Sequence, residues 1–300
     1  MNLAPAFALR LRELGTGFNL QQVREVYEPL LATQPTDGVR VHYDLRYGSD
    51  ERHVLDVYEP VEGDGEVRPI LVYFHGGGFI RGDKRDRANV GWYFARHNVV
   101  TVLCNYRLAP VSQWPAGPED VVRVAQWVAR HCGVYGGRSD CLVLAGESAG
   151  AAHVAAATLI ARYRQSLPVG FRGAALLSGP YNAHLEGLAS MQFGAPTPDP
   201  RNEAYFGSDR ALWQAASTVE LIDTEPCPLL ISFAERDLVQ MQVQAGELFA
   251  RLVTKHAYSP RLHVIPDHNH FSQSFSFNTG DESVSGMLRD FIAGLKFAKS

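Results

Sequence analysis

Cysteine, long apolar runs and clustered basic residues are all scarce in this chain of 300 residues. The four cysteines form no CxxC pair, which argues against a zinc site or a redox motif. No apolar stretch approaches the ~18 residues that a membrane-spanning helix needs. Lys and Arg form no run and the formal net charge is −4, so neither nucleic acid nor a membrane is an expected partner.

The N-terminus also lacks the pattern of a secretory signal. Arg10, Arg12 and Glu13 interrupt its apolar positions, and no cleavage site with small residues follows. Cys104 and Cys141 fall inside apolar runs, where a free cysteine behaves as a small buried hydrophobic residue. We therefore expect a reduced, cytoplasmic protein.

Short apolar runs alternate along the chain with segments of helical periodicity. The predicted strands cover 39–47, 53–58, 70–74, 99–104, 141–145, 174–177, 229–233 and 262–265. The predicted helices lie within 1–33 and over 120–131, 149–163, 240–255 and 283–296. This alternation predicts an α/β fold with a mostly parallel central sheet and helices on both faces.

The first chemical signal is a Gly-x-Ser-x-Gly motif. Ser148 lies where the strand 141–145 meets the helix 149–163, which is the context of a nucleophile elbow. A turn this tight leaves no room for larger side chains at Gly146 and Gly150. The alternative is an ordinary turn between a strand and a helix.

The second signal directly follows the strand 70–74. His75, Gly76, Gly77 and Gly78 form a loop whose backbone N–H groups are free to turn inward. Such donors stabilise the oxyanion of a tetrahedral intermediate by ~3 kcal/mol each. A phosphate-binding loop is the weaker alternative, because neither GxGxxG nor a Walker lysine is present. We expect His75 to order the loop by hydrogen bonding.

Together these segments resemble the hormone-sensitive-lipase-type branch of the α/β-hydrolases. The resemblance rests on HGGGF at 75–79, NYRLAP at 105–110, WPA at 114–116 and GESAG at 146–150, and it covers roughly residues 40–295. It implies an α/β-hydrolase fold with a small cap. It also implies a serine hydrolase with a Ser-His-Asp triad and without a metal or cofactor.

The resemblance places the triad acid just after the strand that follows an insertion. That strand is 229–233, and Asp237 is the preferred acid, with Glu235 as the runner-up. Asp237 also suits the N-cap of a helix that begins at Leu238. These two roles do not exclude each other.

The triad histidine belongs after the strand 262–265. His270 is preferred over His268, because the family has an aromatic or apolar residue after the catalytic histidine and Phe271 fits. A metal pair of both histidines lacks a third ligand motif nearby. Asp267 is expected in a turn, although its order in the chain does not exclude it as the acid.

The resemblance also implies the roles of these residues. His270 takes the proton of Ser148, and Asp237 holds the histidine in the required tautomer. The oxyanion is expected on the backbone N–H groups of Gly77, Gly78 and Ala149. Glu147 is expected to support a neighbouring loop, and Gly76 and Gly146 to support the two turns.

The length alone fits two domains or one large α/β domain. The resemblance favours an N-terminal helical cap segment over 1–38 and a catalytic domain over 39–300. An insertion at about 182–226, rich in proline, is expected to contribute to the cap. Residues 1–38 form either part of this cap or a dimer surface, so a homodimer stays open.

Three functions remain open at this level. The first is hydrolysis of a small-molecule carboxylic ester with a short acyl chain or an aryl alcohol. The run Ser-Ala-Gly-Ala-x-His at 148–153 resembles arylformamidases and feruloyl-esterase-like proteins, which favours an amide hydrolase acting on N-formylkynurenine-like substrates. The third is a non-catalytic binding protein on a hydrolase fold.

Overall fold

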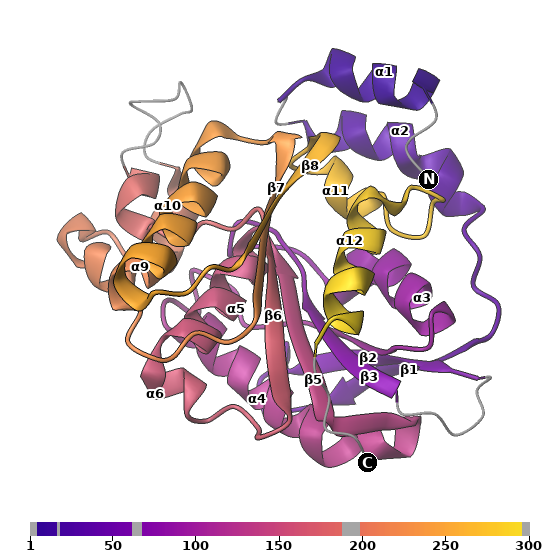
Figure 1. Ribbon diagram of the computed structural model, residues 1–300, viewed down its shortest axis with the longest axis horizontal. Coiled ribbons are helices and arrows are strands. Elements are labelled where there is room, and N and C mark those ends of the chain that lie inside the picture. The colour runs from indigo at the N-terminus through magenta and orange to yellow at the C-terminus, as the bar shows by residue number, and fades with distance from the viewer. Residues whose placement is uncertain (1–4, 17–18, 62–67, 188–198, 296–300) are drawn as a thin grey trace.

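The computed structural model describes residues 5–16, 19–61, 68–187 and 199–295. Within these residues an eight-stranded sheet runs in the order β1-β2-β4-β3-β5-β6-β7-β8 (Figure 1). Strand β2 is antiparallel to β1 and β4, and the other neighbours are parallel. The predicted mostly parallel α/β sheet is therefore confirmed.

The strands are β1 (Val39–Arg46), β2 (Val54–Pro60), β3 (Arg68–Phe74), β4 (Val100–Cys104), β5 (Gly137–Glu147), β6 (Phe171–Leu177), β7 (Leu229–Arg236) and β8 (Arg261–Asn269). The helices include α1 (Pro5–Leu14), α2 (Leu20–Ala32), α3 (Ala88–Arg96), α4 (Ala116–His131), α5 (Ala149–Leu159), α6 (Ala161–Arg164), α8 (Pro200–Phe206), α9 (Thr218–Leu221), α10 (Val239–His256), α11 (Ser272–Phe275) and α12 (Glu282–Ala293).

Helices cover both faces of the sheet. Side chains of α4, α5 and α10 pack with one face, where Val72 and Leu144 are fully buried. Side chains of α3 and α12 pack with the other face, which includes Leu71 and Val143. The central strands are apolar on both sides because neither face meets water. All four cysteines are free and buried.

One predicted helix is wrong in extent. The helix expected over 149–163 ends at Leu159, and Ile160 has an extended backbone with φ −103° and ψ 120°. A new short helix, α6, follows. The carboxylate of Asp223 accepts the N–H of Ala161 at the start of α6. A distant segment thus caps a second helix start that local periodicity does not reveal.

Helices α1 and α2 lie near the carboxyl ends of β7 and β8 (Figure 1). Leu11, Val23 and Tyr27 of α1 and α2 form a buried cluster with Phe275 of α11. Helix α8 belongs to the insertion, of which residues 188–198 lie outside the described part of the chain. In the described ranges, no helix is both long and apolar enough to cross a membrane.

Candidate active site

Ser148 occupies the sharp turn between β5 and α5. Its backbone has φ +50° and ψ −121°, a conformation that costs energy for a residue with a side chain. A Cβ at Gly146 would lie 2.5 Å from the carbonyl carbon of Gly150. A Cβ at Gly150 would lie 2.2 Å from the carbonyl oxygen of Phe74. Both glycines are therefore required by close backbone contacts around the serine.

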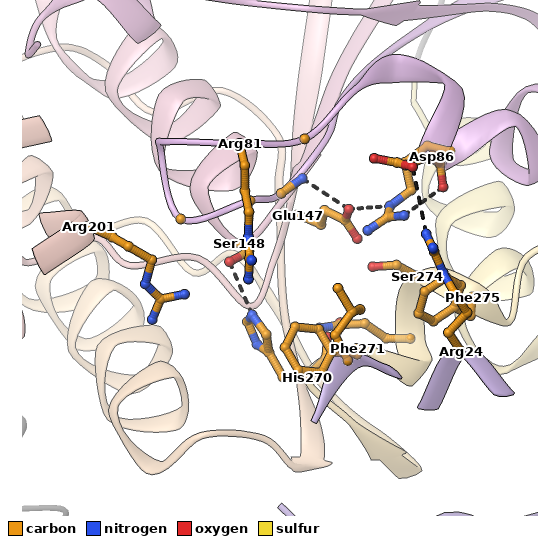
Figure 2. Close-up of a pocket in the computed structure, with 17 residues that line it drawn as sticks. Arg24, Arg81, Asp86, Glu147, Ser148, Arg201, His270, Phe271, Ser274 and Phe275 are labelled. Atoms are coloured by element: carbon orange, nitrogen blue, oxygen red, sulfur yellow. Dashed lines mark hydrogen bonds and ion pairs between the residues drawn. The ribbon is translucent and has the colours of Figure 1, made fainter. Parts of the chain in front are cut away.

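Three predicted residues form one chain of contacts. His270 Nε2 lies 3.1 Å from Ser148 Oγ (Figure 2), and His270 Nδ1 lies 2.7 Å from Asp237 Oδ1. Asp237 is fully buried, and His270 is 8% exposed. They meet because β5, β7 and β8 end at the same edge of the sheet. This is the geometry of a nucleophile, a base and an orienting acid.

The environment of His270 favours its charged form. Burial by itself lowers the pKa of this imidazole, but the charge of Asp237 and its hydrogen bond outweigh burial, so the pKa of His270 is raised above 6.5. The imidazolium that forms when His270 takes a proton is therefore stabilised by its partner.

Asp237 is held by more groups than the sequence predicts. Its Oδ1 accepts the N–H of Leu238 at 2.9 Å, and its Oδ2 accepts the N–H of Ala234 at 3.1 Å. The hydroxyl of Ser178 donates to Oδ2 as well. The N-cap prediction for Asp237 is wrong, because α10 begins one residue later and Leu238 is the N-cap.

Ser178 and its neighbour Gln273 also support Asp237, and the sequence-based predictions include neither residue. Gln273 Nε2 donates to Ser178 Oγ at 2.6 Å and to the carbonyl oxygen of His270 at 3.0 Å. The Gln273 side chain thus connects the backbone of His270 with Ser178, whose hydroxyl donates to Asp237. Ser178 is the first residue after β6. A polar residue directly after a buried parallel strand was the signal that would have found it.

The runner-up residues have other partners. His268 Nδ1 lies 2.9 Å from Ser272 Oγ, and its Nε2 lies 3.0 Å from the carboxylate of Asp281. Asp267 pairs with Arg12, and its N–H donates to Glu235 Oε2 at 2.7 Å. His268 and His270 are therefore engaged by different carboxylates rather than by one shared site.

The glycine loop presents backbone donors near Ser148. Gly77 and Gly78 have φ of +139° and +61°. None of the hydrogen bonds among the described residues uses the N–H of Gly77, Gly78 or Ala149. The N–H of Gly76 differs, because it donates to Glu147 Oε1 at 3.0 Å (Figure 2).

The His75 side chain contacts this glycine loop and the ring of Tyr106. Its ring stacks on Tyr106 with centroids 4.5 Å apart, and its Nδ1 lies 2.7 Å from the carbonyl oxygen of Gly76. Burial lowers the pKa of His75 to about 4, so the ring is neutral at pH 7 and Nδ1–H is the donor. His75 thus contacts both Tyr106 and the glycine loop, and its expected loop-ordering role stays a prediction.

Glu147 forms a buried ion pair with Arg87 of the segment before α3. Only 4% of the Glu147 side chain and 13% of the Arg87 side chain are exposed. The same carboxylate accepts the Gly76 N–H, so one residue connects the nucleophile turn to the glycine loop. The supporting role expected for Glu147 stays a prediction, which these contacts favour.

We expect the substitution Glu147→Gln to lower the free energy of unfolding by about 3 kcal/mol, because it leaves the buried Arg87 guanidinium without its charge partner. Urea unfolding of the purified variant measures this change. The matched control is Glu220→Gln, which breaks the more exposed ion pair with Arg251 and should cost less than about 1 kcal/mol. Equal losses in the two variants would contradict the supporting role.

A cavity of about 180 Å³ opens over Ser148 (Figure 2). Its lining combines Leu20 of α2, the glycine loop, Arg201 of α8 and Phe271. Helix α2 and helix α8 of the insertion therefore both contribute to the cavity wall.

Aromatic side chains gather beside this cavity. Phe79 stacks on Tyr205 with centroids 4.4 Å apart, and Phe206 and Trp114 adjoin them. His153 is buried in this group, and burial lowers its pKa to about 3. It lines a separate small hollow, and Ser148 does not belong to that lining.

The fold and this arrangement define an α/β hydrolase. A family model described as alpha/beta hydrolase fold matches residues 71–273, which is more than half of the chain, and the chain belongs to that family. The human hormone-sensitive lipase is 27% identical over 122 residues, covering 37% of this chain and 11% of the lipase. The predicted resemblance to that branch is confirmed.

Named esterases are among the similar proteins. The esterase LipQ of Mycobacterium tuberculosis is 26% identical over 267 residues, which cover 83% of this chain and 61% of LipQ. The chain thus spans less than two thirds of these curated relatives. The esterase of the archaeon Pyrobaculum calidifontis has a TM-score of 0.73 and 25% identity, with 98% and 99% of the two chains covered.

Proposed function

We propose that this protein is a carboxylic ester hydrolase with Ser148 as its nucleophile, His270 as its base and Asp237 as the orienting acid. The contact chain from Ser148 Oγ through His270 to Asp237, at 3.1 Å and 2.7 Å, carries this proposal. The similarity to named esterases over most of the chain supports the choice of ester chemistry.

The first half of the proposed reaction forms an acyl-enzyme. His270 Nε2 takes the proton of Ser148 Oγ as the oxygen attacks the ester carbonyl carbon. The carbonyl oxygen becomes an oxyanion, which accepts hydrogen bonds from the N–H groups of Gly77, Gly78 and Ala149. His270 then gives its proton to the leaving alcohol oxygen, and the bond between carbonyl carbon and alcohol oxygen breaks.

The second half releases the acid. His270 takes a proton from water as the water oxygen attacks the acyl carbon, and the bond to Ser148 Oγ then breaks as the proton returns to the serine. Asp237 stabilises the imidazolium in each half through its contact with His270 Nδ1. Buried carboxylates with several donors, such as Asp237, suit this role.

We infer that the substrate is a small ester with a short acyl chain or an aryl alcohol. A cavity of about 180 Å³ supports a compact substrate. We also infer that residues 1–38 and the insertion at 182–226 form a cap on a catalytic domain over 39–300. Leu20 of α2 and Arg201 of α8, both in the cavity wall, support this division.

A fluorophosphonate probe tests the nucleophile directly. We expect intact-mass spectrometry to show one adduct per chain, and peptide mapping to place it on Ser148. The Ser148→Ala variant should take no adduct, whereas Ser166→Ala, on an exposed residue of another loop, should label like the parent. An unlabelled folded protein would instead favour a non-catalytic binding protein.

A substrate panel tests the bond that is cleaved. We expect phenyl butyrate and short alkyl esters to be hydrolysed faster than N-formylkynurenine at equal concentration. A marked preference for the formamide would contradict ester hydrolysis and assign the same three residues to amide chemistry.

A further inference from the structure

The cavity over Ser148 carries an excess of positive charge. Four arginines and two carboxylates line it: Arg24, Arg81, Arg87, Arg201, Asp86 and Glu147. The chain as a whole has a formal net charge of −4, so this excess is a local feature of the cavity and does not reflect a basic protein.

Most of these charges compensate one another. The buried ion pair of Glu147 accounts for one arginine. Asp86 lies 3.8 Å from Arg24, and Arg201 Nε lies 2.9 Å from a carboxylate oxygen of Asp199 beside the cavity. Arg81 differs from these, because none of the ion pairs among the described residues includes it.

The position of the Arg81 main chain is set by its contact with the glycine loop. It follows the glycine loop, and a Cβ at Gly77 would lie 1.9 Å from the carbonyl oxygen of Arg81. The main chain of Arg81 is therefore folded back against the loop that supplies the proposed oxyanion donors. Figure 2 shows the Arg81 side chain extending from this loop toward Ser148, and both residues line the same cavity.

We propose that Arg81 binds a carboxylate of the substrate, so that the preferred substrates are anionic esters, such as monoesters of dicarboxylic acids. This inference rests on the proposed ester hydrolysis at Ser148. A guanidinium matches the planar geometry of a carboxylate and forms two parallel hydrogen bonds with it. Arg81 is exposed in the unbound cavity, so a substrate carboxylate would meet it on the open side of the site, where salt screens the attraction.

The site can distinguish an anionic ester from a neutral one only if a charged group lies near the carboxylate of the bound substrate. A neutral ester of the same size leaves the Arg81 guanidinium solvated and gains nothing from it. An anionic ester exchanges water for a charged hydrogen bond, and its transition state keeps that contact. Arg81 is thus assigned as a specificity-determining residue, separate from the residues that perform the bond cleavage.

Matched substrates test this assignment. Ethyl hydrogen glutarate and ethyl pentanoate have acyl chains of equal length and differ in the terminal carboxylate, and their hydrolysis is followed by titration of the released acid. We expect Arg81→Gln to lower kcat/KM for the glutarate ester by about tenfold to hundredfold. The value for the pentanoate ester should stay within about threefold. Arg81→Lys, which keeps the charge, should restore part of the difference.

A second pair of substrates tests whether Arg81 contacts a carboxylate on the acyl side or on the alcohol side of the ester. 4-Carboxyphenyl butyrate and phenyl butyrate carry the difference on the alcohol. A selective loss in Arg81→Gln for either anionic ester supports the proposal, and the affected pair identifies the acyl or the alcohol side. Arg130→Gln, an exposed arginine of α4 outside the cavity lining, should change neither ratio.

One result would overturn the inference while leaving the proposed function intact. This is an unchanged ratio of anionic to neutral kcat/KM in Arg81→Gln for both pairs, with activity retained. A failure of the proposed function looks different, because Ser148→Ala would then hydrolyse every ester of the panel at the parental rate. Raising the ionic strength supplies an independent measurement, since screening should reduce the preference for the anionic esters in the parent protein.

Discussion

Replacing Ser148 by alanine is expected to lower kcat for a short-chain ester by about 10⁴-fold or more. The change removes one oxygen atom from the end of a contact chain whose other members stay in place. His270 then has no hydroxyl to deprotonate, and no acyl-enzyme forms. Initial rates with phenyl butyrate measure the loss, and circular dichroism checks that the variant is folded.

The positive φ at position 148 could affect the folding of Ser148→Ala, so the stability of this variant has to be considered. Alanine has to adopt the same positive φ of +50° as serine, and both have a Cβ, so the strain of the turn is unchanged. We therefore expect near-parental stability. Ser166→Ala serves as the control for activity and should retain the parental rate. A Ser148→Ala variant that is folded and fully active would exclude Ser148 as the nucleophile.

Replacing Asp237 by asparagine is the second change with a large expected effect. We expect a loss of about 10⁴-fold in kcat at neutral pH, because an amide no longer selects the tautomer of His270 that has a free Nε2 lone pair. The contact at 2.7 Å between Asp237 Oδ1 and His270 Nδ1 is where this selection occurs. Asp267→Asn is the matched control, since Asp267 pairs with Arg12 instead.

The same variant has a signature in its pH profile. Activity requires neutral His270, so kcat/KM falls as the pH drops through the pKa of this group. In the parent that pKa is raised above 6.5, because the charge of Asp237 outweighs burial. Removing the charge leaves burial, which lowers the pKa. The acid limb of the residual activity should therefore move to lower pH in Asp237→Asn and stay in place in Asp267→Asn.

A shift to higher pH, or an equal loss of activity in Asp237→Asn and Asp267→Asn, would contradict the assignment of Asp237. The comparison with Glu235→Gln adds a further check, because Glu235 contacts the backbone of Asp267 and not His270. Of these three variants, only Asp237→Asn should alter both kcat and the pH profile.

Much of the sheet and of the site follows from local patterns. The runs at 70–74 and 141–145 are apolar at every position, which only a strand buried on both faces requires, and both form central strands. Ser148 and the glycine loop follow those strands directly. The two strands are parallel neighbours in the sheet and end at the same edge, so the two motifs meet there.

Other features depend on contacts between distant segments. The place of Ser178 directly after a strand indicates a polar residue at this edge of the sheet, but it does not indicate that the hydroxyl donates to Asp237. The end of α5 at Leu159 depends on Asp223, which lies far along the chain. His268 pairs with Asp281 and His270 pairs with Asp237, which lie in separate segments. The sequence around the two histidines therefore does not indicate which carboxylate each one contacts.

The sequence by itself determined the order of strands and helices, the strained serine turn and the glycine loop, because each depends on neighbouring residues and on the period of burial. Only the tertiary structure decided which carboxylate faces His270 and which donors support that carboxylate. It also decided that Arg81, which lines the same cavity as Ser148, has no ion-pair partner among the described residues. The physical reason is the range of the forces involved. Backbone geometry and alternating burial act over a few residues, whereas hydrogen bonds and charge compensation depend on groups that the chain brings together only when it is folded.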